Sequence, residues 1–223
     1  PWFYRPELLN ADGFPWSADL SARTVLLSEE ALRELDLESY VRQRYEETLA
    51  QVPALPGETG DALRRRQMSV LNLRWFMQTL LDRMDRTSMA WGLEARVPFA
   101  DHRIVEYLYN VPWEMKYREG MEKRLLRDAC RDLLPPALLY RKKSPYPKTY
   151  SPAYEALLTR RFRKMLENPQ APVLRFLDRN KAEQFLAQPK DYGRPWFGQL
   201  MAGPQMIAYF LQVNFWMERY GIR

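Results

Sequence analysis

The sequence has 223 residues, of which 46% are hydrophobic and 28% charged, a composition typical of a globular protein with a buried core and not of a disordered chain. Its single cysteine, Cys130, and single histidine, His102, exclude an internal disulfide and a zinc site built from Cys and His. The formal net charge is +6, and residues 121–148 hold eight Lys and Arg against three acids, a local excess that favours an anionic ligand.

The first predicted elements lie before residue 61. Residues 1–27 mix aromatic side chains with prolines and are expected to be irregular. Helical patterning begins at Ser28, and an apolar residue then recurs every four positions over 37–49, which predicts a helix with Asp36 as its N-cap. The prolines and glycines of residues 53–60 predict a loop.

The clearest pattern predicts one long helix that is capped by Asp61 and ends at Gly92. Arg83 lies beside an apolar stripe on this helix, about 80° from its first member at 100° per residue. A guanidinium in that position either reaches a buried anion or extends along the stripe into solvent. The stripe has i, i+3, i+4, i+7 spacing and consists of Leu73, Phe76, Met77, Leu80, Leu81 and Met84.

Residues 93–99 are expected to be extended, because Pro98 disfavours a helical conformation at the residue before it. Side chains of an extended segment alternate between two sides. The charged side chains on one side form a candidate ion pair, with either a structural or a functional role. The two sides are Glu94 with Arg96, and Ala95 with Val97.

Helices are predicted over most of the remaining chain. Asp101 is placed to cap a short one, and a longer one covers 121–134, with Leu125, Leu126, Ala129 and Leu133 inward, until Pro135 and Pro136 stop it. Further helical patterns cover 154–166, 181–186 and 196–220, with a break near Pro204. The last contains the most apolar run, 206–217; a membrane span needs ~20 residues, so a buried helix is expected. No strand series is visible, and a mainly α fold is predicted.

The loop over residues 141–148 is the strongest candidate site. Arg141, Lys142, Lys143 and Lys148 lie in a segment that two prolines stiffen, and fixed cations stabilise a developing phosphate or pyrophosphate charge. The alternative is a solvated basic loop. On the preceding helix, Lys123, Arg127 and Arg131 share a polar face that solvation alone also explains. His102 is read as a first-turn helix residue and Cys130 as a small core residue.

Several motifs are missing from the sequence. It has no Gly-Lys-Ser/Thr loop, no Gly-rich dinucleotide fingerprint and no Ser-Gly-Gly loop. A nucleotide's phosphates are usually held by backbone N–H groups at a helix N-terminus. We therefore expect this chain by itself to bind no nucleotide and no metal ion.

Three segments of the sequence together resemble one enzyme family, the glutamine-hydrolysing asparagine synthetases. In order, they are DRMDRTSMAWGLEARVPFADHRIVEYLYNVP, MEKRLLRDACRDLLP and YRKKSPYPKT. The resemblance extends from the aromatic N-terminal stretch to the end of the chain and covers residues 1–223. It implies the helical C-terminal part of an α/β synthetase domain of the adenine-nucleotide α-hydrolase-like (PP-loop) class.

The resemblance also implies partners and chemistry. In this family a glutaminase domain with an N-terminal catalytic cysteine precedes the synthetase domain, and a PP-loop core handles ATP and aspartate. Neither is expected within this chain, which by itself should be inactive. The parent would be an ATP- and Mg²⁺-dependent ligase that converts aspartate through β-aspartyl-AMP into asparagine, using ammonia from glutamine. A cytoplasmic setting is expected, and a homodimer is an open alternative to a monomer.

Individual residues carry the resemblance. Lys143 matches the lysine of the family's R-x-K loop, the expected pyrophosphate contact, and Arg83 matches an arginine near the phosphates; both are expected to be catalytic. Lys123 matches the lysine after the Met-Glu pair, and Arg141, Glu94 and Arg96 are further candidate substrate-binding residues. Ala95 and Val97 match small apolar residues beside the ammonia passage.

Besides an interaction scaffold, two other readings stay open. The first is a related amidotransferase or cyclase that acts on another carboxylate, because the residues that choose the acid are expected outside this chain. The second is a basic helical module that binds nucleic acid, which the net charge favours but no recognition motif supports.

Overall fold

The computed structural model describes residues 12–14, 20–142, 151–187 and 203–222. Helices make up most of this part of the chain, as predicted, and its one sheet has two short strands. The chain forms two compact units, a middle unit described over residues 45–142 and a flanking unit described over 12–14, 20–44, 151–187 and 203–222. None of the described helices is long and apolar enough to cross a membrane.

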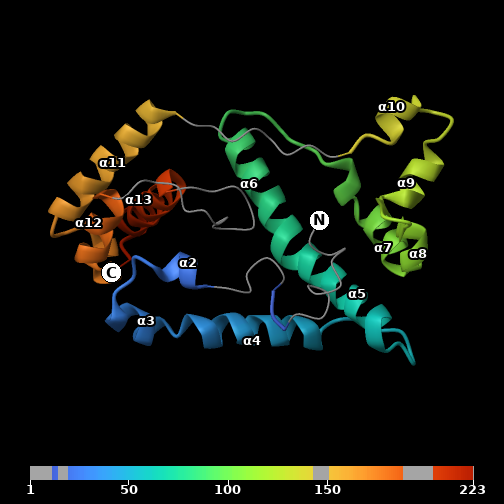
Figure 1. Ribbon diagram of the computed structural model, residues 1–223, viewed down its shortest axis with the longest axis horizontal. Helices are drawn as coiled ribbons and strands as arrows, with labels where there is room; N and C mark the ends of the chain where they lie inside the picture. Colours follow the sequence, from blue (N-terminus) through green and yellow to red (C-terminus); the bar gives the residue numbers. More distant parts are fainter. Residues whose placement is uncertain (1–11, 15–19, 143–150, 188–202, 223) are drawn as a thin grey trace. The chain divides into compact units, whose positions relative to one another are not determined.

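The flanking unit is built around the contact between its two longest helices, α11 and α13, which pack against each other (Figure 1). Phe162 of α11 and Ile207 of α13 are fully buried in its core. The apolar run at 206–217 is therefore a helix with one buried face, whereas Tyr209, Phe215 and Trp216 of the same run are exposed. The helices of this unit are α2 Ser21–Thr24, α3 Glu29–Leu35, α11 Pro152–Glu167, η4 Pro172–Arg175, α12 Arg179–Ala187 and α13 Gly203–Tyr220.

Pro204 lies in the first turn of α13, where the missing N–H of proline costs no helical hydrogen bond; because residues 196–202 lie outside the described residues, the break near Pro204 stays a prediction. Two expectations for this unit need correction. Residues 21–24, within the stretch expected to be irregular, form the short helix α2. Asp36 does not act as a side-chain N-cap. It ends α3 in the left-handed conformation, with φ 38°, and its carbonyl accepts a hydrogen bond from the Tyr40 N–H in α4, Leu37–Ala50, at 3.0 Å.

The long helix predicted in the middle unit is present as three consecutive segments: α5 Gly60–Leu71, the π-helical η2 Asn72–Met77 and α6 Gln78–Met89 (Figure 1). Its N-cap is Thr59, two residues before the predicted Asp61. Its end at Gly92 is as predicted, and Gly92 has φ 71°. The Gly92 N–H donates a hydrogen bond to the Met89 carbonyl, and the Leu93 N–H donates one to the Ser88 carbonyl. This pair of hydrogen bonds is typical of a glycine C-cap.

The apolar stripe lies on one face of this helix, as predicted, but the described residues bury it only partly. All six of its members, Leu73 to Met84, are half-buried, and none is fully buried by the described residues. One turn earlier, Met68 and Leu71 are buried, with exposed fractions of 3% and 0%. The described part of the middle unit thus covers α5 well and leaves the stripe partly open to solvent.

The segment after Gly92 follows the prediction closely. Residues 93–97 belong to no helix or strand, and Val97, before Pro98, is extended with φ −117° and ψ 99°. The chain then leads through η3, Pro98–Ala100, into α7, His102–Asn110. Asp101 caps α7, since its Oδ1 accepts a hydrogen bond from the Arg103 N–H at 2.9 Å. Helix α8, Trp113–Lys116, comes next.

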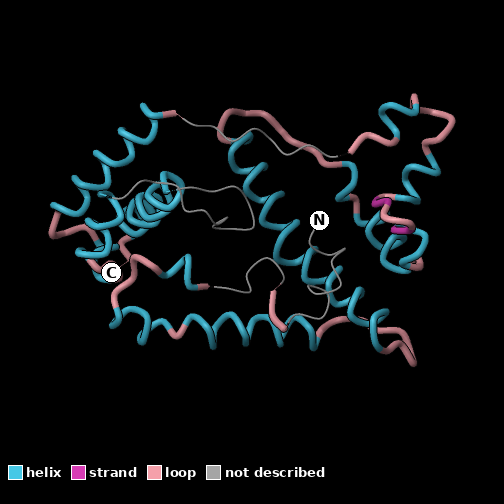
Figure 2. The backbone as a smooth tube through the Cα atoms, viewed as in Figure 1, coloured by secondary structure: helices cyan, strands magenta, loops and turns pink. Residues whose placement is uncertain are grey.

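The predicted helix over residues 121–134 is wrong at both ends. Its start is a hairpin of β1, Tyr117–Arg118, and β2, Met121–Glu122 (Figure 2), whose two turn residues have the positive φ values of a type I′ turn. Only α9, Arg124–Ala129, is helical, and α10, Pro136–Leu139, follows. Of the four residues predicted to point inward, Leu125 is half-buried, whereas Leu126, Ala129 and Leu133 are exposed.

Candidate functional site

Arg83 extends from the exposed side of α6. Its guanidinium has no hydrogen-bond or ion-pair partner among the described residues. Arg86, one turn further on the same helix, has its Nε 3.2 Å from the Asp82 carboxylate. Both arginines are exposed on α6, but only Arg86 has a partner among the described residues.

Lys123 stands between the hairpin and α9 in an unusual backbone conformation. Its φ and ψ, 57° and 33°, are left-handed, a region that non-glycine residues rarely occupy. The side chain is exposed and has no partner within the described part of the chain. A strained residue at a candidate site is consistent with a functional constraint.

The basic segment that follows α10 begins at Arg141. Arg141 and Lys142 are exposed and their side chains contact no partner among the residues described. Lys143 and Lys148, which the sequence also places in this site, lie outside the described residues.

The extended segment brings two predicted site residues together. Arg96 Nε lies 3.0 Å from Glu94 Oε1, and Arg96 Nη2 lies 3.3 Å from the other carboxylate oxygen, so the pair shares one side of the segment as expected. Both side chains are exposed. On the other side, Ala95 is half-buried and Val97 is 38% exposed.

The other cations around these residues are engaged with protein groups. Asp128 accepts hydrogen bonds from Arg124 and Arg131, each at 2.9 Å, and these bonds, with Arg124 the larger cause, hold the pKa of Asp128 below its usual range. Arg103 in the same way lowers the pKa of Asp101.

Two further cations of the middle unit are half-buried and bonded to protein groups. Arg66 contacts Glu58 at 2.6 Å and lies over the ring of Tyr109, 4.6 Å from its centroid; the Glu58 hydrogen bond raises the pKa of Arg66. Lys116 donates to the Leu108 carbonyl at 2.9 Å, and burial lowers the pKa of its ammonium. Such groups stabilise the fold and are not available to a ligand.

The described cations of the middle unit thus fall into two groups, those bonded to a protein group and those without a side-chain partner. Over the described residues 45–142, the cations without a side-chain partner are Arg83, Lys123, Arg141 and Lys142. Three of these four are residues that the sequence assigns to the site. No described hydrogen bond or ion pair joins Arg83 to Lys123 or to Arg141. Within the described part of this unit, these four cations are therefore the ones left to interact with an anion.

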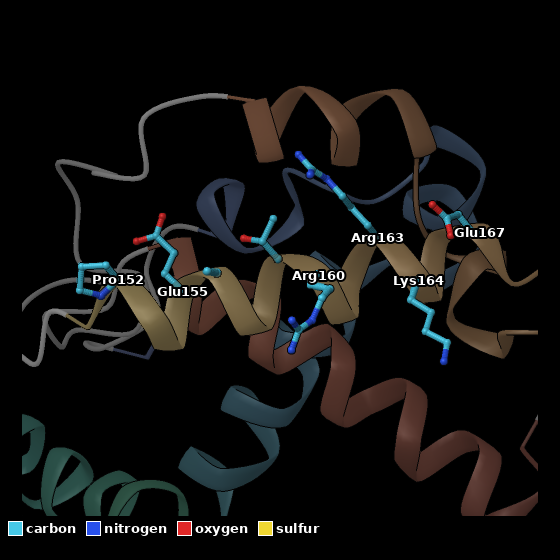
Figure 3. A pocket seen from close by; sticks show the side chains of 8 residues that line it. Pro152, Glu155, Arg160, Arg163, Lys164 and Glu167 are labelled. Atoms are coloured by element: carbon cyan, nitrogen blue, oxygen red, sulfur yellow. The ribbon is translucent and has the colours of Figure 1, made fainter.

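The flanking unit carries a different surface feature, an open depression along one face of α11 (Figure 3). All of its lining residues come from this single helix, among them Arg160, Arg163 and Lys164, and none was predicted as a site residue. No set of three or more His, Cys, Asp and Glu within the described residues could hold a metal ion.

Comparison with known proteins shows the family of this chain. Residues 1–218 match the family model of asparagine synthase. The chain belongs to the asparagine synthase family. It is 47% identical over all 223 residues to the glutamine-hydrolyzing asparagine synthetase 3 of Bacillus subtilis, of which it covers 36%.

Mammalian relatives match over a shorter stretch. The glutamine-hydrolyzing asparagine synthetases of Rattus norvegicus and Homo sapiens are 48% and 46% identical over 67 residues, which are 29% of this chain and 12% of each relative. The chain spans about a third of the length of the Bacillus relative. The resemblance inferred from three sequence segments is confirmed, and family membership does not favour the reading as a nucleic-acid-binding module.

Proposed function

We propose that the chain is the helical C-terminal portion of the synthetase domain of a glutamine-hydrolysing asparagine synthetase. In this proposal the parent protein is a cytoplasmic, ATP-dependent ligase. A PP-loop core and an N-terminal glutaminase domain of the same parent supply the nucleotide site and the ammonia. Support comes from the family match over residues 1–218 and from relatives that are about three times longer than this chain.

The chemistry assigned to the parent has two steps. A carboxylate oxygen of aspartate attacks the α-phosphorus of ATP, the bond from that phosphorus to the bridging oxygen breaks, and pyrophosphate leaves with the electron pair. Ammonia then attacks the acyl carbon of β-aspartyl-AMP, and AMP departs as asparagine forms. Negative charge grows on pyrophosphate in the first step, so cations held near it accelerate that step.

The observation that carries the proposal is the set of unpaired cations on the middle unit. Arg83 and Lys143 are assigned to the leaving pyrophosphate, and Lys123 and Arg141 to substrate binding. Glu94 and Arg96 already neutralise each other at 3.0 Å, so their assigned role is to shape the substrate site. Ala95 and Val97, on the opposite side of the same segment, are assigned to the ammonia passage.

Mg²⁺, which ATP-dependent ligation in the parent would need, does not fit the described residues. They contain no cluster of three acidic or imidazole groups, whereas Mg²⁺ prefers several oxygen ligands. The metal ion is therefore assigned to ATP and to the part of the parent that this chain does not contain.

The test is product analysis with the full-length protein. With aspartate, ATP, Mg²⁺ and glutamine, the proposal predicts equal amounts of asparagine, AMP and pyrophosphate. Formation of ADP and phosphate, or amidation of a different carboxylic acid with none of aspartate, would contradict it. The second outcome would instead assign the parent to a related amidotransferase with another acid substrate.

A further inference from the structure

Arg127 connects two parts of the middle unit that are separate in the sequence. Its Nε donates to the carbonyl of Glu122 at 2.9 Å, and its Nη2 lies 3.5 Å from the Glu122 carboxylate. Its Nη1 donates to the carbonyl of Leu139. The Arg127 side chain is only 13% exposed. One half-buried guanidinium therefore holds the end of β2 and the end of α10.

Each of these two anchor points lies one or two residues before a candidate site cation. Glu122 is followed by Lys123, and the Leu139 carbonyl lies two residues before Arg141. Leu139 itself is buried, with an exposed fraction of 5%. The Arg127 guanidinium thus holds the backbone carbonyls that lie just before the unpaired cations Lys123 and Arg141.

The backbone of Arg127 supports the same arrangement. Its N–H donates to the carbonyl of Lys123 at 3.0 Å, so Arg127 holds residue 122 with its side chain and residue 123 with its main chain. Lys123 has φ 57°, and a conformation of this kind persists where surrounding contacts determine it. Arg127 provides two such contacts.

We propose that Arg127 is a positioning residue for the anion site, which holds the backbone beside Lys123 and beside Arg141 at a fixed separation. The proposal rests on the proposed function, in which Lys123 and Arg141 bind the anionic substrate. Arg127 itself touches no substrate, because its donors are occupied by protein oxygens. Its contribution is to fix the backbone positions of Lys123 and Arg141 before the anion binds.

Arginine is required at this position for a geometric reason. A guanidinium presents several N–H donors in a rigid planar fork, whereas a lysine ammonium is a single mobile point charge. Lysine at 127 could bond one of the two carbonyls but not hold both in fixed directions. Arg131, on the turn after α9, is a matched control, since it is exposed and contacts only Asp128.

The experiment compares R127K with R131K in the full-length protein. For R127K we expect kcat of asparagine synthesis to fall on the order of 10–100-fold, since a misplacement of about 1 Å can cost 10²-fold, with glutamine hydrolysis unchanged. R131K should match the wild type in both activities. Calorimetric titration with pyrophosphate, the probe used, should show weaker binding for R127K alone.

A double-variant comparison separates positioning from a general loss of structure. If Arg127 acts through Lys123, then R127K combined with K123A should lose less than the sum of the two single effects, because the residue being positioned is already gone. Fully additive losses would overturn the proposal. Should R127K not fold, R127Q, whose amide still donates to one carbonyl, takes its place with the same expectations.

The outcomes distinguish this inference from the proposed function. A full-length protein that makes no asparagine would refute the proposed function, while pyrophosphate binding would still test Arg127. A protein that makes asparagine but in which R127K behaves like R131K in rate and in pyrophosphate affinity would refute only the role of Arg127.

Discussion

Replacing Arg83 by alanine should separate catalysis from stability. The Arg83 side chain is exposed and has no partner in the described part of the chain, and alanine is the best helix former. Surface substitutions of this kind change stability by no more than about 0.5 kcal/mol. If Arg83 contacts the leaving pyrophosphate, its loss should lower the synthesis rate by about 10²–10³, equivalent to roughly 2.7–4 kcal/mol of transition-state stabilisation.

Arg86→Ala is the matched control on the same helix. It removes an exposed i,i+4 ion pair with Asp82 at 3.2 Å, which is worth about 0.3–0.5 kcal/mol, and should leave the synthesis rate within a factor of about two. The assay measures asparagine formation and glutamine hydrolysis by the full-length variants, together with their melting curves. A wild-type rate in Arg83→Ala, or equal losses in the two variants, would refute the assignment of Arg83.

Three further predictions concern the chain as a whole. The isolated chain should catalyse no aspartate-dependent exchange between ATP and pyrophosphate, because it has no phosphate-binding loop; measurable exchange would refute this. The isolated chain should bind a hydrophobic dye or self-associate, since the stripe from Leu73 to Met84 is only half-buried; a cooperative monomer without dye binding would speak against it. Phe162→Ala, at a fully buried position of α11, should destabilise the flanking unit by about 3–5 kcal/mol, measured by hydrogen exchange; protection equal to that of the wild type would show that this core is not as tightly packed as described.

Local sequence signals predicted the parts of the fold that depend on near neighbours. The end of α6 follows from Gly92, the cap of α7 from Asp101 and the buried face of α13 from its apolar run, and all three are observed. Each is set by residues within one or two turns of the chain. The Glu94–Arg96 pair belongs to the same group, because alternation along an extended segment places the two side chains together.

The failures have an equally physical origin. Residues 121–134 were expected to form one helix because their apolar spacing fits 3.6 residues per turn. The Glu119-Gly120 turn and the left-handed Lys123 instead start the segment as a hairpin. The glycine at position 120 was the available signal, since a two-residue hairpin turn of this type needs positive φ at both positions.

The pairing of the cations could not be predicted from the sequence. Arg127 meets the Leu139 carbonyl 12 positions away, and Arg66 meets Tyr109 43 positions away; neither contact follows a local period. The sequence places Lys123, Arg127 and Arg131 on one polar face that solvation alone also explains. The structure separates them into one cation without a partner and two that are bonded to protein oxygens.

The most direct test of the account is the contrast between Lys143→Ala and Lys142→Ala in the full-length protein. We expect Lys143→Ala to lower asparagine synthesis by about 10²–10³, as for removal of one charge-stabilising donor, and to leave glutamine hydrolysis intact. Lys142→Ala should do much less, because adjacent side chains of an extended segment point in different directions. Synthesis at near wild-type rate in Lys143→Ala, or the larger loss in Lys142→Ala, would contradict the assignment of this loop to the leaving pyrophosphate.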